Sequence, residues 1–481
     1  MPIAIYNSLT RAKAPLQTLE PERVGMYVCG PTVYDDSHIG HLMGPVLFDA
    51  IARWLSYRGY QVRFVHNITD IDDKIIQRMR ETGEDWQAIT ERYTAMYLDY
   101  LQALHVETIT DHPRCSDFVD RIIAYIEALV ARDIAYPATD GVYFDLRRHE
   151  GYGKLSGRDP ADMLAGARIQ RDDGLRNPGD FCLWKLAKPG EPEWPSPWGA
   201  GRPGWHIECT VMSSCLLGEH FDIHGGGDDL KFPHHENEIA QAEAHSGCYA
   251  ACWMHNGLIQ YEGAKISKSD PRMRDPEFAK QFKASWLLER FGPATLRFFL
   301  LQGHYRRPFD FAPQNLEAAQ VALAKLHKQL GDLLDEAPQA GDPAADRLDQ
   351  QFQVLKQKFE DAMDDDFNTG AAIGHLFAMA GKARKAPEEQ KPQALRLLRD
   401  CGRLLGLFLP GDTAKPAQAI PAQEVDQGLV AGLMELVLEL RQDARARRDF
   451  GTADRIREQL QTLGISVTDS KDGASWQLDP G

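Results

Sequence analysis

The sequence of 481 residues contains no hydrophobic run near the roughly 18 consecutive apolar residues that a membrane-spanning helix needs. Its amino-terminal residues lack the basic and apolar segments of a secretory signal peptide. The eight cysteines are scattered, without the close spacing of a small disulfide-bonded scaffold. We therefore expect a cytoplasmic protein with no membrane partner, in which any special cysteine is a metal ligand or a nucleophile.

Three motifs of common nucleotide-binding and hydrolytic sites are also missing. No Gly-x-x-x-x-Gly-Lys-Ser/Thr segment is present, so a Walker loop does not hold a nucleotide. Segment 224–227, His-Gly-Gly-Gly, is similar to a lipase oxyanion loop, but the chain has no Gly-x-Ser-x-Gly turn. His235-Glu236 lacks the second histidine of a zinc-protease helix. Cys248 and Cys252 lie in apolar surroundings, and we interpret them as core cysteines rather than a metal pair.

Acidic residues outnumber basic ones by 70 to 54, which gives a formal charge of −16. This balance argues against a protein that coats nucleic acid, but it allows a local basic patch because charges are screened over about 10 Å. Between Arg441 and Arg457, six arginines accompany three aspartates. That segment fits either a helix that contacts RNA phosphates or a solvated arginine-rich helix. Trp476 fits either a stacking surface for a base or a small core.

The pattern of short apolar runs and helical stripes predicts an α/β protein with a parallel sheet. Val24–Val28 and Val62–Val65 read as strands, with a helix between them from about His41. A Gly- and Pro-rich segment at about 140–204 is interpreted as a loop-rich insertion. Leucines at heptad-like intervals beyond about 315 predict a helical bundle. We expect domains at 1–262, 263–314, 315–410 and 424–481, the last after a proline-containing linker.

Two motifs far apart in the chain contain candidate anion-binding residues. His38 and His41 follow the first strand at the start of a helix, where the helix dipole favours an anion. Lys265 and Lys268 lie on a segment after Gly263, and alone they could equally be solvated surface lysines. Together, His-Ile-Gly-His and Lys-Ile-Ser-Lys-Ser resemble the two signatures of class I aminoacyl-tRNA synthetases.

Four separated residues form a candidate zinc site. Cys29 precedes the histidine pair, Cys209 comes much later, and His234 and Glu238 share one helical face through their i,i+4 spacing. Two sulfurs, one nitrogen and one oxygen make a plausible tetrahedral zinc set. The spacing alone leaves open that the cysteines are core thiols and that His234 and Glu238 are an ordinary pair.

Longer segments make the resemblance specific to the cysteinyl-tRNA synthetase family. It extends over nearly the whole chain and is weakest in the tail. The altered loop (Ile266 in place of Met, then Asp270-Pro271-Arg272) and Met43 depart from the family pattern. The segments that carry the resemblance are 27–35 (YVCGPTVYD), 67–74 (NITDIDDK), 201–209 (GRPGWHIEC), 232–238 (FPHHENE) and 363–369 (MDDDFNT).

The resemblance implies a Rossmann-type catalytic domain, a helical bundle beside the tRNA stem, and an anticodon-recognition domain at 424–481. It implies one zinc ion per chain that selects the thiolate of L-cysteine, ATP with Mg²⁺ as a substrate, tRNA(Cys) as the acceptor, and a monomer. A purely structural zinc is the alternative. We expect the α-phosphate of ATP to meet His38 and His41, and the leaving phosphates to meet Lys268 and Lys265. Further candidates for the substrate pocket are Gly30, Thr69, Trp205 and Asp229.

Three other functions are compatible with parts of the pattern. A cysteine ligase of the mycothiol-pathway type would share the zinc pocket and join cysteine to an amino sugar, but should lack the basic tail. A non-catalytic RNA-binding paralogue would tolerate loss of His38, His41 or Lys268, and all three are present. A zinc hydrolase would need an open metal position, which four protein ligands disfavour.

Overall fold

The structure is a computed structural model of the 481-residue chain. It describes residues 2–158, 175–265, 270–336 and 350–412, followed by 434, 437–444, 449, 452–453, 456, 460, 465–470 and 473–478. The chain divides into two units, 1–416 and 417–481. Within the described ranges, every helix is too short or too polar to cross a lipid bilayer.

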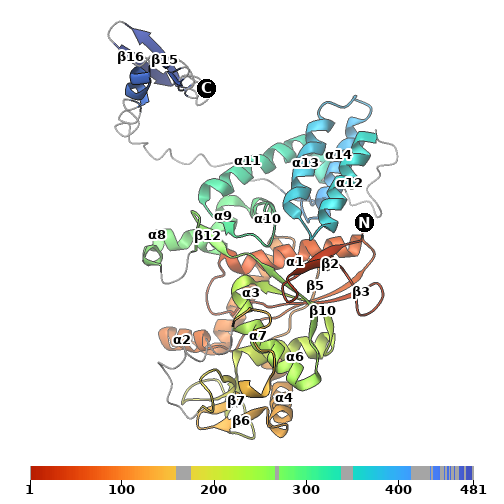
Figure 1. Cartoon of the computed structure of the whole chain (residues 1–481), viewed down its shortest axis with the longest axis vertical. Coiled ribbons are helices and arrows are strands. Elements are labelled where there is room, and N and C mark those ends of the chain that lie inside the picture. Colours follow the sequence, from red (N-terminus) through yellow and green to blue (C-terminus); the bar gives the residue numbers. More distant parts are fainter. Residues whose placement is uncertain are drawn as a thin grey trace. The chain divides into compact units, whose positions relative to one another are not determined.

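A five-stranded parallel sheet forms the centre of the first unit (Figure 1). The strand order is β11-β10-β3-β4-β5, and each neighbouring pair is parallel. The chain extends the sheet from β3 in one direction and later adds β10 and β11 on the other side. This reversal creates a crevice at the carboxyl ends of β3 and β10, where α/β proteins bind ligands. The strands are β3 (Arg23–Val28), β4 (Gln61–His66), β5 (Ile109–Asp111), β10 (Phe221–Gly227) and β11 (Ala250–Asn256).

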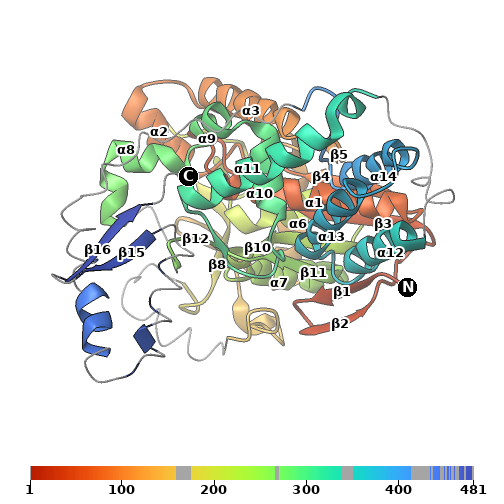
Figure 2. The same cartoon turned by 90° about the horizontal axis from the view of Figure 1, so that it is seen from above.

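Alternate residues of β3 pack into two different cores, so both faces of the sheet are covered. Met26 and Val28 join the core that includes α1 and the helices beyond residue 284, whereas Tyr27 joins the core of α4, α6 and α7. In Figure 1, α1 lies between the sheet and the helical bundle, and in Figure 2, seen from above, the bundle helices overlap α1. The parallel α/β sheet predicted from the sequence is confirmed. The helices of this part are α1 (Ile39–Tyr57), α2 (Asp73–Thr82), α3 (Trp86–Ala103), α4 (Val119–Ala131), α6 (Trp205–Leu217) and α7 (His234–Ser246).

Smaller antiparallel sheets surround the central one. The segment expected to be rich in loops contributes three strands to a four-stranded sheet of order β6-β7-β8-β9. Short helical turns connect several elements; they are η1 (Cys115–Phe118), η2 (Leu146–Arg148), η3 (Asp228–Lys231), η4 (Pro271–Arg274), η5 (Lys280–Phe282) and η6 (Gly331–Leu334). The additional strands are β1 (Ala4–Asn7), β2 (Ala12–Pro15), β6 (Ala135–Ala138), β7 (Gly141–Phe144), β8 (Phe181–Leu186), β9 (Gly201–Pro203), β12 (Ile259–Tyr261), β13 (Ala264–Lys265) and β14 (Phe309–Asp310).

The leucine stripe predicted for the helical region is a core. Leu316, Leu323, Leu326 and Leu330 of α11 are all buried, because 3.6-residue periodicity places them on one face. The helices are α8 (Pro276–Ala279), α9 (Ala284–Phe291), α10 (Pro293–Leu301), α11 (Pro313–Leu330), α12 (Gln350–Asp364), α13 (Thr369–Ala383) and α14 (Lys391–Arg403).

The second unit contains the antiparallel pair β15 (Ile465–Ser470) and β16 (Gly473–Leu478). Met434 and Leu460 are buried in its small core, and Trp476 packs against them while staying partly accessible. Trp476 therefore contributes to a core. Five of the six arginines in the basic segment lie outside the described residues, at positions 445, 447, 448, 455 and 457.

Candidate active site

A cavity of about 410 Å³ lies at the carboxyl end of β3, beside the crevice between β3 and β10. Its walls come from the end of β3, the beginnings of α1, α2 and α6, the η3 turn and the segment after β11. This is the position that the reversal of strand order favours for ligand binding. The sequence-predicted residues that line it are Cys29, Gly30, His38, His41, Trp205 and Asp229.

His38 and His41 lie together at the start of α1, with ring centroids 3.8 Å apart. His38 caps the helix: its Nδ1 accepts a 3.1 Å hydrogen bond from the backbone N–H of Gly40. Because Nδ1 is the acceptor, we assign the proton of the neutral ring to Nε2, which is then a free donor. A Cβ atom on Gly40 would lie 2.8 Å from the His38 ring, so glycine is needed for this arrangement.

The surroundings of both histidines favour the neutral form of the imidazole. Burial lowers the pKa of His38; the carboxylate of Asp229 opposes this effect, and the ammonium of Lys74 adds to it. Burial, the neighbouring His38 ring and Lys74 together lower the pKa of His41 well below its usual value. The pair can therefore donate hydrogen bonds to an anion, but it does not supply positive charge.

The four predicted metal ligands converge, although they come from three elements far apart in the sequence. Cys29 follows β3, Cys209 is in α6, and His234 and Glu238 are one turn apart in α7. One candidate ligand atom from each lies within 4.8 Å of the others. The Sγ atoms of Cys29 and Cys209 are 3.7 Å apart, and Nε2 of His234 is 3.0 Å from Oε1 of Glu238.

The electrostatics of this cluster favour the deprotonated form of two of the four ligands, Cys209 and Glu238. A hydrogen bond from the Cys29 thiol lowers the pKa of Cys209 to about 6, with a further contribution from His234. Burial raises the pKa of Cys29, and the hydrogen bond to Cys209 raises it further. Burial would raise the pKa of Glu238, but His224 and His234 outweigh it and lower that pKa below the usual value. Cys209 therefore favours its thiolate form and Glu238 its carboxylate form.

The spacing of the donor atoms fits a tetrahedral ion. Zinc–sulfur bonds of about 2.3 Å place two sulfur ligands about 3.8 Å apart in a tetrahedron. The separation of 3.7 Å between the two Sγ atoms and that of 3.6 Å between Sγ of Cys29 and Oε1 of Glu238 match these edges. Two sulfurs, an imidazole and a carboxylate also suit zinc chemically. The residues present therefore fit a zinc ion.

A second donor set overlaps the first, because His224 and His235 also approach Cys29 and Glu238. Nε2 of His224 is already 2.8 Å from Oε2 of Glu238, and its ring stacks on the buried Trp253 at 4.3 Å. Two sulfur ligands and the position beside the cavity favour the set with Cys209 and His234. His224 and His235 then surround the metal ligands.

Outer hydrogen bonds orient the ligands. Oε2 of Glu238 accepts hydrogen bonds from His224 and from the hydroxyl of Tyr249 at 2.9 Å, which leaves Oε1 directed toward His234 and Cys29. Nδ1 of His234 lies 3.0 Å from Nδ1 of His206. Such partners hold metal ligands in place and commonly matter for metal affinity.

The remaining predicted pocket residues take different positions. Trp205 begins α6, is 41 % exposed, and stacks on His234 with centroids 4.4 Å apart. Gly30 packs against the backbone of Asn67 so closely that a Cβ atom would lie 1.6 Å from the Asn67 carbonyl oxygen. Thr69 is buried, and its hydroxyl accepts a hydrogen bond from the Asn67 amide.

Asp229 lies in the η3 turn after β10 and lines the cavity. Of the two predicted lysines, Lys265 is the last residue of β13, and only its backbone belongs to the described structure. Lys268 also lies outside the described residues. The structure therefore brings together the histidines, the metal ligands, Trp205 and Asp229.

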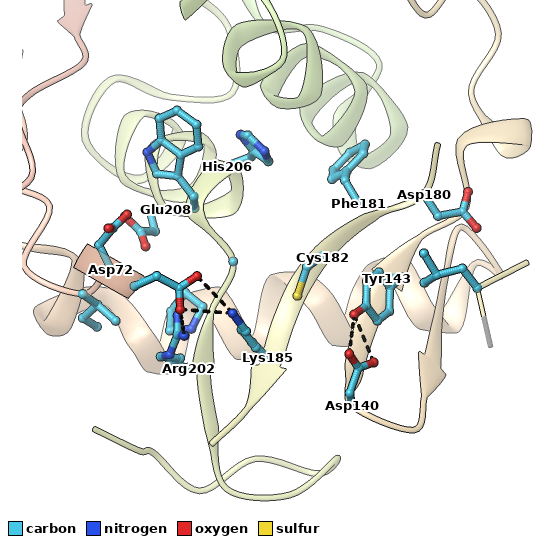
Figure 3. Close-up of a pocket in the computed structure, with 16 residues that line it drawn as sticks. Asp72, Asp140, Tyr143, Asp180, Phe181, Cys182, Lys185, Arg202, His206 and Glu208 are labelled. Carbon is cyan, nitrogen blue, oxygen red and sulfur yellow. Dashed lines mark hydrogen bonds and ion pairs between the residues drawn. The ribbon is translucent and has the colours of Figure 1, made fainter. Parts of the chain in front are cut away.

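A second cavity of about 500 Å³ lies on the other side of Trp205, between the start of α2 and the β6–β9 sheet. Figure 3 shows Arg202 and Lys185 close together in its wall. Both form ion pairs with Asp73, at 3.0 Å for Lys185. Glu208 is buried nearby, and burial raises its pKa well above the usual value. The first turn of α2 thus borders both cavities.

The sequence of the first unit matches the family of class I tRNA synthetase (C) catalytic domains over residues 15–321. A DALR domain matches over 358–409, and a cysteinyl-tRNA ligase anticodon binding domain matches over 431–476. The curated cysteine–tRNA ligase of Pelotomaculum thermopropionicum is 45 % identical over 98 % of this chain and 99 % of that protein. The chain belongs to the cysteine–tRNA ligase family.

Other relatives agree with this family. The cysteine–tRNA ligase of Thermococcus gammatolerans is 42 % identical over 99 % of each chain. Among solved structures, Mycobacterium tuberculosis methionyl-tRNA synthetase in complex with methionyl-adenylate is similar with a TM-score of 0.55. That likeness covers 80 % of this chain and 90 % of the other at 14 % identity, and it supports the fold. This chain therefore has the fold of class I tRNA synthetases.

Sequence reasoning missed several residues of this cysteine–tRNA ligase site. His224 stands in a segment similar to a lipase loop and Tyr249 belongs to no motif, so the sequence predicts neither as part of the site. Lys74 ends the segment 67–74 and follows Asp72, whose side chain caps α2. The signal that could have found Lys74 is this cap, because it marks the start of the helix that follows β4. In a parallel α/β sheet such a helix begins near the carboxyl ends of the strands, where ligands bind.

Proposed function

We propose that the protein ligates L-cysteine to tRNA(Cys), consuming ATP and releasing AMP and diphosphate. The observation that carries the proposal is the position of a Cys29–Cys209–His234–Glu238 donor set beside the His38–His41 pair. A sulfur-selective metal site and an anion-binding helix start would then lie in one pocket. The curated relatives named cysteine–tRNA ligase support the same activity.

The first step forms cysteinyl-adenylate. A carboxylate oxygen of cysteine attacks the α-phosphorus of ATP, and the bond from that phosphorus to the diphosphate breaks. The Nε2–H donor of His38, with His41 beside it, hydrogen-bonds to oxygen atoms at this centre. Lys268 and Lys265 hold the leaving diphosphate, and Mg²⁺ accompanies ATP. No covalent enzyme intermediate is needed, because positioning and charge stabilisation suffice.

The second step transfers cysteine to tRNA. A ribose hydroxyl at the 3′ end of tRNA attacks the carbonyl carbon of the adenylate, and AMP leaves with the bonding electrons. The hydroxyl proton passes to the leaving phosphate or to solvent. Neither step requires a protein nucleophile, so the role of the chain is to orient the substrates.

Cys29, Cys209, His234 and Glu238 would hold one zinc ion. Bound zinc would supply a soft Lewis acid that prefers the thiolate of cysteine to the hydroxyl of serine. Shape alone separates such close analogues by only roughly 10–200-fold, which explains the value of a sulfur-specific contact. Trp205, stacked on His234, covers this end of the pocket.

The other pocket residues complete cysteine recognition. The carboxylate of Asp229 in the cavity complements the α-ammonium group of cysteine. Because Gly30 has no side chain, the segment after β3 can lie close to the backbone of Asn67. The Thr69 hydroxyl accepts a hydrogen bond from the side-chain amide of Asn67 and helps to hold it in place. We further propose that residues 263–314 and the bundle at 315–410 contact the tRNA stem, that 424–481 read the anticodon, and that the enzyme acts as a cytoplasmic monomer.

Two assays on the zinc-loaded protein test the function. We expect cysteine-dependent ATP–diphosphate exchange, and transfer of labelled cysteine to total tRNA as an acid-stable, base-labile product. Exchange without transfer to tRNA would favour an enzyme that joins cysteine to another amine. Absence of both activities would contradict the proposal and favour a non-catalytic paralogue.

A further inference from the structure

Lys74 is the feature of the reaction cavity that the proposed mechanism does not yet use. It lies in the first turn of α2, two residues after the Asp72 cap, and it lines the cavity that contains His38 and His41. Among the described residues of that lining, Lys74 is the one lysine or arginine. The charged carboxylate that shares the lining is Asp229.

Neighbouring side chains leave the Lys74 charge available for a ligand. Asp73, the adjacent residue, points into the second cavity and pairs with Arg202 and Lys185. Within the described ranges, Lys74 forms no ion pair within 4.0 Å of a carboxylate. Its Nζ lies 5.8 Å from the centroid of the Tyr34 ring, a distance that fits a weak cation–π contact. An ammonium group so placed can bind an incoming anion.

Because His38 and His41 favour their neutral forms, positive charge at this cavity has to come from another residue. His38 and His41 provide hydrogen bonds at the cavity that Lys74 also lines, and the Lys74 ammonium contributes to lowering the pKa of both rings. When cysteine attacks, negative charge accumulates on the non-bridging oxygens of the α-phosphoryl group. Fixed charge aimed at such oxygens is usually the largest catalytic contribution of a site.

We propose that the ammonium of Lys74 binds a non-bridging oxygen of the ATP α-phosphoryl group and stabilises the charge that develops there during adenylate formation. This inference rests on the proposed adenylation of cysteine. Lys74 stays protonated throughout: the carboxylate–phosphorus bond forms, the bond to diphosphate breaks, and no proton leaves the lysine.

Substitution of Lys74 tests the contact. Lys74→Gln should lower kcat for cysteine-dependent ATP–diphosphate exchange about 10²-fold or more, the size of effect seen when one charge-stabilising donor is removed. Lys74→Arg should retain more activity than Lys74→Gln, because the charge remains. The matched control is Arg92→Gln on the neighbouring helix α3, which removes one positive charge from an exposed pair with Glu84. The control should keep wild-type exchange, and all variants should keep wild-type zinc content and melting temperature.

A sulfur-for-oxygen substitution at the α-phosphorus separates direct contact from a structural role. With the Rp and Sp diastereomers of α-thio-ATP, the wild type should discriminate between the two, and Lys74→Gln should lose most of that discrimination. An unchanged thio effect, or a rise in KM for cysteine alone, would overturn the proposal. A defect confined to single-turnover transfer to tRNA would assign Lys74 to a tRNA phosphate and would also overturn it. Failure of the proposed function is distinguishable, because the wild type itself would then show no cysteine-dependent exchange.

Discussion

The Sγ atoms of Cys29 and Cys209 lie 3.7 Å apart, although 180 residues separate them in the chain. The end of β3 and the second turn of α6 meet there because β10 returns to pair with β3 in parallel. The same return delivers α7, which carries His234 and Glu238. The donor set is therefore a direct consequence of the strand order.

The first prediction concerns this donor set. Cys209→Ser should lower zinc affinity at least tenfold, because a serine hydroxyl does not deprotonate near pH 7 as the ligand role requires. Zinc per chain, measured by elemental analysis after dialysis against a weak chelator, checks this. Cys401→Ser removes an equally buried thiol in α14 and should leave the zinc content unchanged. Equal zinc in all three proteins would contradict the assignment.

The second prediction concerns the outer hydrogen bonds of Glu238. Tyr249→Phe removes the 2.9 Å hydrogen bond to Oε2 and should weaken zinc binding about tenfold while the ligands stay in place. Competition with a chromophoric chelator measures the affinity. Tyr125→Phe is the matched control, because that hydroxyl bonds to the backbone carbonyl of Gln241. If both variants bound zinc like the wild type, the role given to Tyr249 would be wrong.

The third prediction concerns the close approach of His38 and Gly40. Gly40→Ala places a methyl group 2.8 Å from the His38 ring and should displace it, lowering kcat for exchange about 10²-fold. Gly374→Ala in α13, which is not part of the cavity lining, meets nothing within 4 Å. That control should keep its activity and gain about 0.5–1 kcal/mol in helix stability. Comparable exchange rates in the two variants would show that the His38 position is not catalytically important.

Several local features of the fold and of the site are predicted correctly from the sequence. His234 and Glu238 share a helical face through i,i+4 spacing, and the leucines of α11 are buried as their periodicity predicts. The parallel sheet followed from alternating strands and helices. These features depend on residues close together in the chain.

Features made by distant segments were harder to predict. Nothing near Tyr249 indicates that its hydroxyl reaches Glu238, since that contact depends on how β11 packs beside α7. Strand β8 lies in a segment whose glycines and prolines favour loops, and it forms because β7 and β9 pair with it. The role proposed for Lys74 depends on its neighbour Asp73, which pairs with Arg202 and not with Lys74.

The fourth prediction concerns a buried ion pair that joins α1 to α10. Asp49 contacts Arg297 and Arg53. Burial alone would raise the pKa of Asp49, but the two guanidinium groups outweigh it and lower that pKa below its usual value. A depressed folded-state pKa contributes stability above the unfolded-state pKa near 4, and this stability is lost as pH falls through the folded-state value.

Asp49→Asn should therefore destabilise the first unit by about 3–5 kcal/mol at pH 7, because it leaves Arg297 buried without its charge partner. Urea unfolding at pH 7 measures the loss, and the difference from wild type should shrink as pH falls below 4. Asp365→Asn, at an exposed pair with Lys13, should cost less than about 1 kcal/mol. Equal stability of the Asp49 variant and the wild type at pH 7 would refute the role of this pair.

The central claim is that this chain attaches cysteine, and not serine, to tRNA(Cys). The most direct test is to incubate the zinc-loaded protein with ATP, Mg²⁺ and tRNA(Cys), and to separate charged from uncharged tRNA on acid gels. With L-cysteine we expect nearly complete charging, and with L-serine at equal concentration no detectable charging. Uncharged tRNA in the presence of cysteine, or equal charging by serine, would contradict the account.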